Sequence, residues 1–225
     1  GQLVSVLASS MTQFGLTIWA YQETGSAVAL GLMQTAFIVP FLLLSPFAGV
    51  WVDRYNRKMM MMVSDLAAIS ATAGILVLSL TGNLQIWHLY VASVINGLGN
   101  TFQWPAYSAT ISTMLPREKY NRSNGMMSLV ESGPGVLAPL LAGILLPFIH
   151  LTGILFLDVA TFIIAIISLL LVHIPQPART QEGEAGRGSL LREAAFGFQY
   201  IFTRKGLLYL LLYFIASIKT AVGLQ

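Results

Sequence analysis

The chain has 225 residues, of which 56% are hydrophobic and only 9% are charged, and its formal net charge is +3. A water-soluble domain of this length needs many charged side chains to cover its surface, so this composition excludes an ordinary soluble globular protein. The chain contains no cysteine, which excludes disulfides and thiolate metal sites.

The apolar residues are gathered into seven long segments. A helix needs about 20 residues to span the hydrocarbon of a bilayer, and each segment is near or above that length. Only helices and closed barrels satisfy their backbone in lipid, and apolar runs without period-two alternation favour helices. We therefore predict an all-α polytopic membrane protein with helices at about 3–21, 28–51, 60–81, 86–114, 124–148, 152–173 and 206–225.

The basic residues give the predicted bundle an orientation. Eleven of the 12 Lys and Arg residues lie in connections that follow even-numbered segments. The odd-numbered connections "QETGSA", "TGNLQ" and "IHLTG" carry none. The positive-inside rule then predicts a multi-pass protein of the plasma (inner) membrane with a cytoplasmic N-terminus.

Three regions follow from this pattern. Residues 1–173 are predicted to form a six-helix transmembrane bundle, and residues 206–225 a seventh helix. Residues 174–205 are predicted to form a cytoplasmic linker, because they are polar and contain the flexible stretches "PQP" and "EGEAGRG". The stretch "SLLREAAFGFQYIFTRK" indicates an amphipathic helix on the inner leaflet or an extension of helix seven. We expect the chain to be part of a longer protein whose C-terminal half is missing here.

Residues 49–58 read "GVWVDRYNRK" and carry a resemblance. Gly49, Asp53, Arg54, Arg57 and Lys58 resemble the signature of the major facilitator superfamily between helices two and three. The stretches "TGSAVALGL", "LLLSPFAGVWVDR", "FQWPAYSATI" and "LAPLLAGILL" are similar to its drug-efflux branch, which includes macrolide-efflux and enterobactin-exporter proteins. This resemblance covers residues 1 to about 177 and implies the major facilitator fold.

The charged loop is interpreted as a conformational latch. The resemblance implies that its charge network locks the two halves of the protein in the outward-facing state and releases them during inward opening. A plain positive-inside loop would explain the basic residues, but not Gly49 and Asp53 at this spacing. Gly49 is expected to let helices approach closely. Asn56 stands where the family usually has Gly, and we expect it to keep a tight, left-handed turn.

Residues 131–143, "ESGPGVLAPLLAG", resemble the Gly-Pro-rich helix-five motif of antiporters in this superfamily. Small residues four apart permit close helix packing, and proline bends a helix, so we expect a pliable gating wall. Ordinary packing with a proline kink is compatible with that expectation. The residues concerned are Gly133, Pro134, Gly135, Pro139 and Gly143.

Polar residues inside a membrane helix usually face the protein interior or a wet cavity. One helical face of residues 86–114 carries Asn96, Asn100, Gln103 and Tyr107, and a second stripe in residues 3–21 carries Ser5, Ser9 and Gln13. The resemblance places both helices beside the central cavity. Interhelical hydrogen bonds that only hold the bundle together are the alternative. The predicted substrate-cavity residues are Gln13, Asn100, Gln103 and Trp104.

Three carboxyl groups lie inside predicted helices. Glu131 is our candidate for proton coupling, because a carboxyl group within the bilayer can exchange a proton for cargo; a structural carboxyl is the alternative. Asp65 is expected to join the network of Asp53 and Arg57. Asp158 is expected near the outer end of its helix, in contact with solvent.

The sequence thus predicts a secondary active transporter that exports hydrophobic drugs or amphiphilic small molecules by alternating access and is coupled to protons. Uptake, or transport of one narrow substrate such as a siderophore or metabolite, is the alternative within the same superfamily. The expected partners are a small-molecule substrate, the lipid bilayer and protons, without nucleic acid. No phosphate loop, metal-ligand spacing or paired catalytic groups are found in the sequence, so no cofactor, metal or enzymatic activity is expected.

Overall fold

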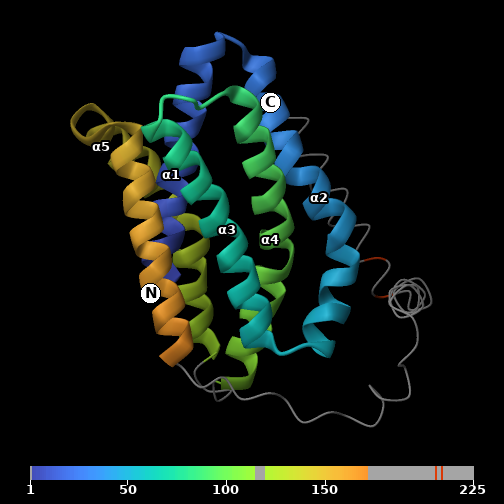
Figure 1. The fold of residues 1–225 in the computed structure, drawn as a ribbon. Helices are drawn as coiled ribbons and strands as arrows, with labels where there is room; N and C mark the ends of the chain where they lie inside the picture. Colours follow the sequence, from blue (N-terminus) through green and yellow to red (C-terminus); the bar gives the residue numbers. More distant parts are fainter. Residues whose placement is uncertain (1, 115–119, 172–205, 207–208, 210–225) are drawn as a thin grey trace. The chain divides into compact units, whose positions relative to one another are not determined.

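The computed structural model describes residues 2–114, 120–171, 206 and 209 (Figure 1). Side chains are not described at residues 2, 50, 53, 54, 104, 111–114, 120–124, 126, 127 and 131. The described chain is helical and contains no strand, which confirms the all-α prediction. Its helices are α1 (Gln2–Thr24), α2 (Ala27–Arg54), α3 (Arg57–Leu80), α4 (Ile86–Met114) and α5 (Tyr120–Leu171).

Helix α5 consists of two limbs that meet at His150. The backbone of His150 has φ 54° and ψ 178°, which is not helical and reverses the chain. Figure 1 shows the two limbs, residues 120–149 and 151–171, joined by a loop and running in opposite directions. The described chain therefore forms six helical limbs, in agreement with the six segments predicted over this range. The predicted linker and helix seven lie outside the described residues, apart from residues 206 and 209.

Several helices are long and apolar enough to cross a membrane, namely Leu3–Thr24, Ala27–Gly49, Arg57–Leu80 and Ser128–Leu171. The last range covers both limbs of α5, because its 44 residues exceed twice the roughly 20 needed for one crossing. Helix α4 is not among these ranges, and it carries the amides Asn96, Asn100 and Gln103 in its middle.

Glycines end two of the helices. Gly25 follows α1 with φ 61°, and Gly82 follows α3 with φ 68°. Glycine adopts this left-handed conformation without steric cost and so commonly ends helices. The N–H of Gly25 donates to the Tyr21 carbonyl oxygen at 2.8 Å, and that of Asn83 donates to Leu78 at 3.0 Å. These turns bring the chain back at once into the next antiparallel helix.

Helices α1 and α2 pack mainly against partners that are distant in sequence. Helix α1 packs mainly against α5, α2 mainly against α4, and α3 against both α4 and α5 (Figure 1). Glycines allow two close approaches along α4. A Cβ atom at Gly97 would collide with the Phe37 carbonyl oxygen of α2, and one at Gly99 would lie 3.2 Å from the Ser64 carbonyl oxygen of α3. Small residues of this kind are the usual means of close packing between membrane helices.

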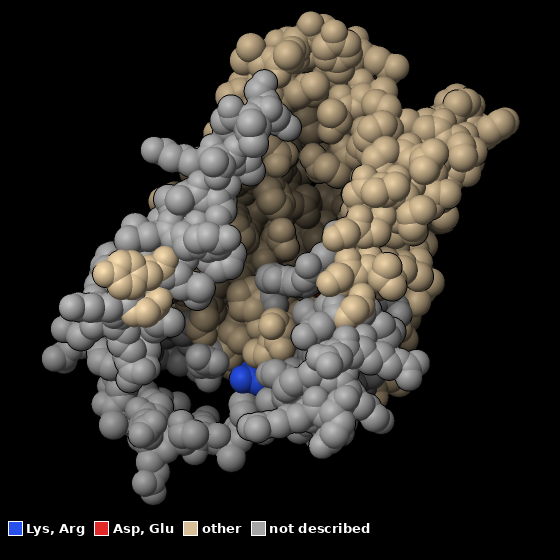
Figure 2. Space-filling view, turned by 180° about the vertical axis from the view of Figure 1, so that it is seen from behind, with Lys and Arg blue, Asp and Glu red and all other residues tan. Residues whose placement is uncertain are grey.

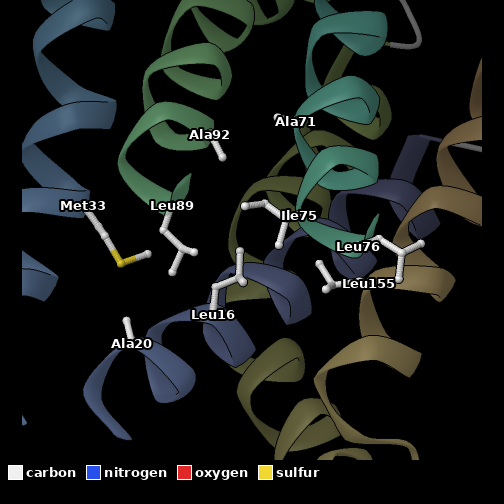
Figure 3. Close-up of a cluster of buried hydrophobic side chains, with 9 residues drawn as sticks. All are labelled: Leu16, Ala20, Met33, Ala71, Ile75, Leu76, Leu89, Ala92 and Leu155. Carbon is white, nitrogen blue, oxygen red and sulfur yellow. The ribbon is translucent and has the colours of Figure 1, made fainter. Parts of the chain in front are cut away.

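An apolar cluster occupies the end of the bundle that holds Gly25 and Gly82. Figure 3 shows side chains from all five helices in this cluster, and Leu89 and Leu155 within it are almost completely buried. The cluster closes this end of the bundle. Its buried members are Leu16, Ala20, Met33, Ala71, Ile75, Leu76, Leu89, Ala92 and Leu155.

Candidate functional site: a polar cavity in the helix bundle

A cavity of about 360 Å³ lies between α1, α2, α3, α4 and the second limb of α5. Its volume falls in the range of roughly 300–1,000 Å³ that is usual for small-molecule sites. Figure 2 shows the described surface hollowed on one face, with walls formed almost entirely by residues other than Lys, Arg, Asp and Glu. The polar side chains that line the cavity are Ser5, Ser9, Ser10, Thr12, Gln13, Gln34, Ser64, Thr72, Asn96, Asn100, Gln103 and Asp158.

Helical periodicity explains how the sequence assembles this lining. Side chains three or four residues apart share a helix face, so the stripes on α1 and α4 each face one side. Three of the four residues predicted to line a substrate cavity, Gln13, Asn100 and Gln103, do lie on this wall. The side chain of the fourth, Trp104, is outside the described residues. Gln34, on α2, also lines the cavity and was not singled out in the sequence.

The lining combines hydrogen-bonding groups with aromatic rings. Amides come from α1, α2 and α4, while Phe37 and Phe162 supply apolar surface. Among the described lining residues there is one carboxyl group and no Lys or Arg. This chemistry suits neutral or cationic molecules with both polar and apolar parts, because the described lining has no positive charge to attract an anion.

Asp158, on the second limb of α5, is buried on the cavity wall with 1% of its surface exposed. The Ser9 hydroxyl of α1 donates to its Oδ1 at 2.9 Å, and the Thr72 hydroxyl of α3 donates to its Oδ2 at 3.4 Å. The expectation that Asp158 contacts solvent is therefore wrong. Thr72 and Asp158 lie the same number of residues from Leu80 and His150, where their helices end, and that equal depth was a usable sequence signal.

Asp65, on α3, is also buried, with 1% exposed. Its Oδ1 accepts a hydrogen bond of 2.6 Å from Nε2 of Gln103, while its buried Oδ2 has no hydrogen-bond partner among the described residues. The expectation that Asp65 joins a network with Asp53 and Arg57 is therefore wrong, because the carboxyl group is bound by Gln103. Asp65 lies two helical turns beyond Arg57, which places it beside the amide stripe of α4 and fixes Gln103 at the cavity.

The charged loop joins the start of α3 to two other helices. Nη1 of Arg57, which is buried, donates to the Ala109 carbonyl oxygen of α4 at 2.8 Å. Nζ of Lys58 donates to the Leu170 carbonyl oxygen at the end of α5, also at 2.8 Å. The side chains of the other two charged members of the motif, Asp53 and Arg54, lie outside the described residues.

Asn56 does not adopt the expected left-handed turn. Its backbone has φ −64° and ψ 117°, and its side chain accepts a hydrogen bond of 3.2 Å from the Met59 N–H. Asn56 is thus the N-cap of α3, a position that asparagine occupies well in any sequence. At Gly49, none of the described residues lies within 4 Å of where a Cβ would stand, so the expected close approach is not formed among them.

The Gly-Pro motif lies on the first limb of α5, whose described side chains do not line the cavity. The helix continues through Pro134 and Pro139. No described atom lies within 4 Å of a Cβ built at the three glycines of the motif, Gly133, Gly135 and Gly143. The limb instead packs on α1 through Ala138 and Ala142, which are buried beside Met11. The side chain of Glu131 is outside the described residues.

The family model of the Major Facilitator Superfamily matches residues 1–223 of the chain. The chain belongs to the major facilitator superfamily. This match confirms the resemblance found in the loop motif and identifies a helical, multi-pass membrane protein.

Within the major facilitator superfamily, the chain is similar to several efflux proteins. It is 28% identical over 213 residues to macrolide efflux protein A of Streptococcus pyogenes, covering 94% of the chain and 52% of that protein. It is 29% identical over 189 residues to macrolide efflux protein A of Enterococcus faecalis, covering 84% and 57%. It is 26% identical over 196 residues to multidrug resistance protein 1 of Bacillus subtilis (strain 168), covering 87% and 47%. The chain therefore spans about half the length of these relatives.

Proposed function

We propose that the full protein is a secondary active transporter that exports hydrophobic drugs or amphiphilic small molecules by alternating access. Membership of the major facilitator superfamily and the efflux names of the similar proteins support a transporter and not an enzyme. This chain would then supply one half of the transport path, and the C-terminal half of the same protein would supply the other.

The observation that carries the proposal is the cavity lined by amides, hydroxyls and aromatic rings within an apolar bundle. Polar groups are costly inside a membrane protein unless they are paired or face a wet space. Gln13 and Asn100 are largely exposed within this cavity, so their amides are available to a ligand. An amphiphile would place its polar groups on these amides and its apolar surface on Phe37 and Phe162.

The charged loop is proposed as the conformational latch, with Gly49, Asp53, Arg54, Arg57 and Lys58 as its parts. Two bonds support this role, because Arg57 and Lys58 tie α3 to the backbones of α4 and α5 at a single point. Movement between helices at this end would break both bonds together. The helix-five motif, from Gly133 to Gly143, is proposed as a gating segment on the strength of the family resemblance.

The proposed orientation puts the N-terminus and the charged loop on the cytoplasmic side of the plasma (inner) membrane. The proposed coupling ion is the proton, and Glu131 remains a candidate for carrying it. The distribution of Lys and Arg supports the orientation.

Uptake, or transport of one narrow and more polar substrate, is the second candidate. The five amides on the cavity wall favour it, because a site built from many hydrogen-bonding groups discriminates strongly against ligands that leave those groups unpaired.

Efflux from cells that express the full-length protein tests the proposal, with ethidium and a macrolide as cargoes and a protonophore to collapse the gradient. Gln13→Leu removes one cavity amide and is expected to weaken cargo binding by about fivefold, the equivalent of one hydrogen bond of about 1 kcal/mol. Gln22→Leu is the matched control, because Gln22 lies on the same helix, is exposed and does not line the cavity.

Export that stops with the protonophore and weakens only in Gln13→Leu would support the proposal. A normally expressed protein that exports neither cargo would refute drug export. Accumulation of cargo inside the cells would establish uptake instead.

A further inference from the structure

We propose that Asp158, together with the hydroxyl groups of Ser9, Thr12 and Thr72, forms the site that takes up and releases the coupling proton. This inference rests on the proposed function, since it assumes transport driven by a cation gradient. It assigns the coupling role to a residue of the cavity wall, in place of Glu131.

The position of Asp158 is the first argument. Its side chain is almost completely buried, yet it forms part of the wall of the cavity that would hold cargo. Asp65 is equally buried but does not line the cavity and is bound by Gln103. Of these two buried carboxyl groups, only Asp158 stands where water or cargo in the cavity could exchange a proton with it.

The chemistry of its partners is the second argument. A hydroxyl group can donate or accept a hydrogen bond, whereas Lys and Arg can only donate. The Ser9 hydroxyl lies 2.9 Å from Oδ1 of Asp158 and 3.0 Å from the Ser5 carbonyl oxygen. When Asp158 is charged, Ser9 donates to it. When Asp158 carries a proton, its own O–H donates to Ser9, and Ser9 donates to Ser5.

Thr12 gives an independent observation. It lies one helical turn after Ser9, is 5% exposed and stands beside Asp158. Its Oγ1 is buried and has no hydrogen-bond partner among the described residues. Because Thr12 stands beside the carboxyl group, a small rotation of either side chain would pair them. Its hydroxyl can donate to the charged carboxylate or accept from the protonated carboxyl group, so it can serve the site in both protonation states.

No described cation neutralises the Asp158 carboxylate. Helices α1 and α3 pack against α5, to which Asp158 itself belongs. Arg57 and Lys58 lie about four helical turns before Thr72 on α3 and bind carbonyl oxygens of α4 and α5. The titratable residues of these elements are Tyr21, Glu23, Arg57, Lys58, Asp65, Tyr120, Arg122, Glu131, His150 and Asp158 itself, of which Tyr120, Arg122 and Glu131 have side chains outside the described residues.

The proton balance is simple. A proton passes from water in the cavity to a carboxylate oxygen of Asp158, and on release it returns to water on the other side of the membrane. Uptake changes the hydrogen bonds that join α5 to α1 through Ser9 and to α3 through Thr72. Proton occupancy is thereby linked to the packing of the helices that enclose the cargo.

The full-length protein in liposomes tests this assignment with two measurements on radiolabelled macrolide. One is accumulation driven by a pH gradient. The other is exchange of labelled for unlabelled macrolide at equal pH, which needs cargo movement but no net proton transfer. Asp158→Asn is expected to retain exchange within about twofold and to lose gradient-driven accumulation by tenfold or more. Glu23→Gln is the control, because Glu23 is an exposed carboxyl group at the end of α1 that does not line the cavity, and this variant is expected to keep the proton dependence of the wild type. Glu131→Gln tests the other candidate.

Because Asp158→Asn can fail to fold, Ser9→Ala and Asp158→Glu are measured beside it. Ser9→Ala is expected to shift the pH profile of accumulation, and Asp158→Glu to restore part of the accumulation. Gradient-driven accumulation that survives in Asp158→Asn, or is lost only in Glu131→Gln, would overturn the assignment while leaving the transporter proposal intact. Wild-type protein that accumulates no macrolide in a pH gradient or a sodium gradient would refute the proposed function instead. Accumulation driven only by a sodium gradient would show that the coupling ion is sodium and not the proton.

Discussion

The amide Nε2 of Gln103 donates a hydrogen bond of 2.6 Å to Oδ1 of Asp65 and so joins α4 to α3 in the interior of the bundle. Replacing Gln103 with Leu would leave the buried carboxyl group without this partner. We expect the free energy of unfolding to fall by about 1–3 kcal/mol, as is usual when a buried polar group loses its hydrogen bond. Thermal unfolding of the full-length protein in detergent measures the change.

A double-mutant cycle separates this bond from general effects on α4. In an Asp65→Leu background, Gln103→Leu should cost much less than in the wild type, because the carboxyl group is already gone. Equal costs in the two backgrounds would show that the bond does not hold the helices together.

Gly97 allows the closest contact between α2 and α4. Gly97→Ala would drive a methyl group into the Phe37 carbonyl oxygen, which is backbone and cannot rotate away. Overpacking of this kind typically costs about 1–3 kcal/mol, so the unfolding midpoint should fall. Gly31→Ala on α2 is the control, since no described atom lies within 4 Å of its Cβ, and alanine is about 0.5–1 kcal/mol better than glycine inside a helix. A Gly97→Ala protein as stable as Gly31→Ala would contradict the contact.

His150 carries backbone strain at the reversal of α5. Its φ of 54° with ψ of 178° is a region almost restricted to glycine, and such residues cost about 1–3 kcal/mol. His150→Gly should therefore raise the unfolding midpoint, even after the loss of about 0.5–1 kcal/mol from the greater freedom of glycine in the unfolded chain. His150→Ala removes the same imidazole but keeps the strain, so it should not stabilise the protein. Equal stability of the two variants would disprove the strain.

Asn56 caps α3 through its bond to the Met59 N–H. Asn56→Ala should lower the free energy of unfolding by about 1 kcal/mol, whereas Asn56→Asp should keep the cap and Asn56→Gly should cost only a few tenths. The comparison uses the same thermal measurement. If alanine and aspartate variants unfold together, the cap contributes nothing to stability.

The lengths of the apolar segments and the helical spacing of polar residues account for most of the correct predictions from the sequence. The lengths of the apolar runs predict the helices, and the polar stretch "IHLTG" predicts the reversal at His150. Both predictions succeed because they do not depend on which helices are in contact. The amide stripes of α1 and α4 were visible for the same reason, since side chains spaced by one turn share a face. The structure therefore places three of the predicted residues, Gln13, Asn100 and Gln103, on the cavity wall. Their role in binding cargo stays a prediction.

Pairing between distant helices was not readable. Asp158 takes its hydrogen bonds from Ser9 and Thr72, and Asp65 takes its own from Gln103. The sequence shows at most that two residues lie at the same depth, as Thr72 and Asp158 do, and it does not show which helices are neighbours, so the predicted surroundings of both carboxyl groups are wrong. The predicted left-handed turn at Asn56 is wrong for a local reason. Asparagine is common both in left-handed turns and at helix N-caps, so its identity alone does not distinguish the two.

The pairing of α1 with α5 has a consequence for how the protein is made. Helix α1 ends at Thr24, whereas Asp158, which pairs with Ser9 of α1, lies in the second limb of α5. At a synthesis rate of about 5–20 residues per second, roughly 7–27 s pass between the completion of α1 and the synthesis of Asp158. During that interval Ser9 enters the bilayer without the carboxyl group that pairs with it. Until Asp158 arrives, this polar part of α1 depends on water, lipid headgroups or the insertion machinery.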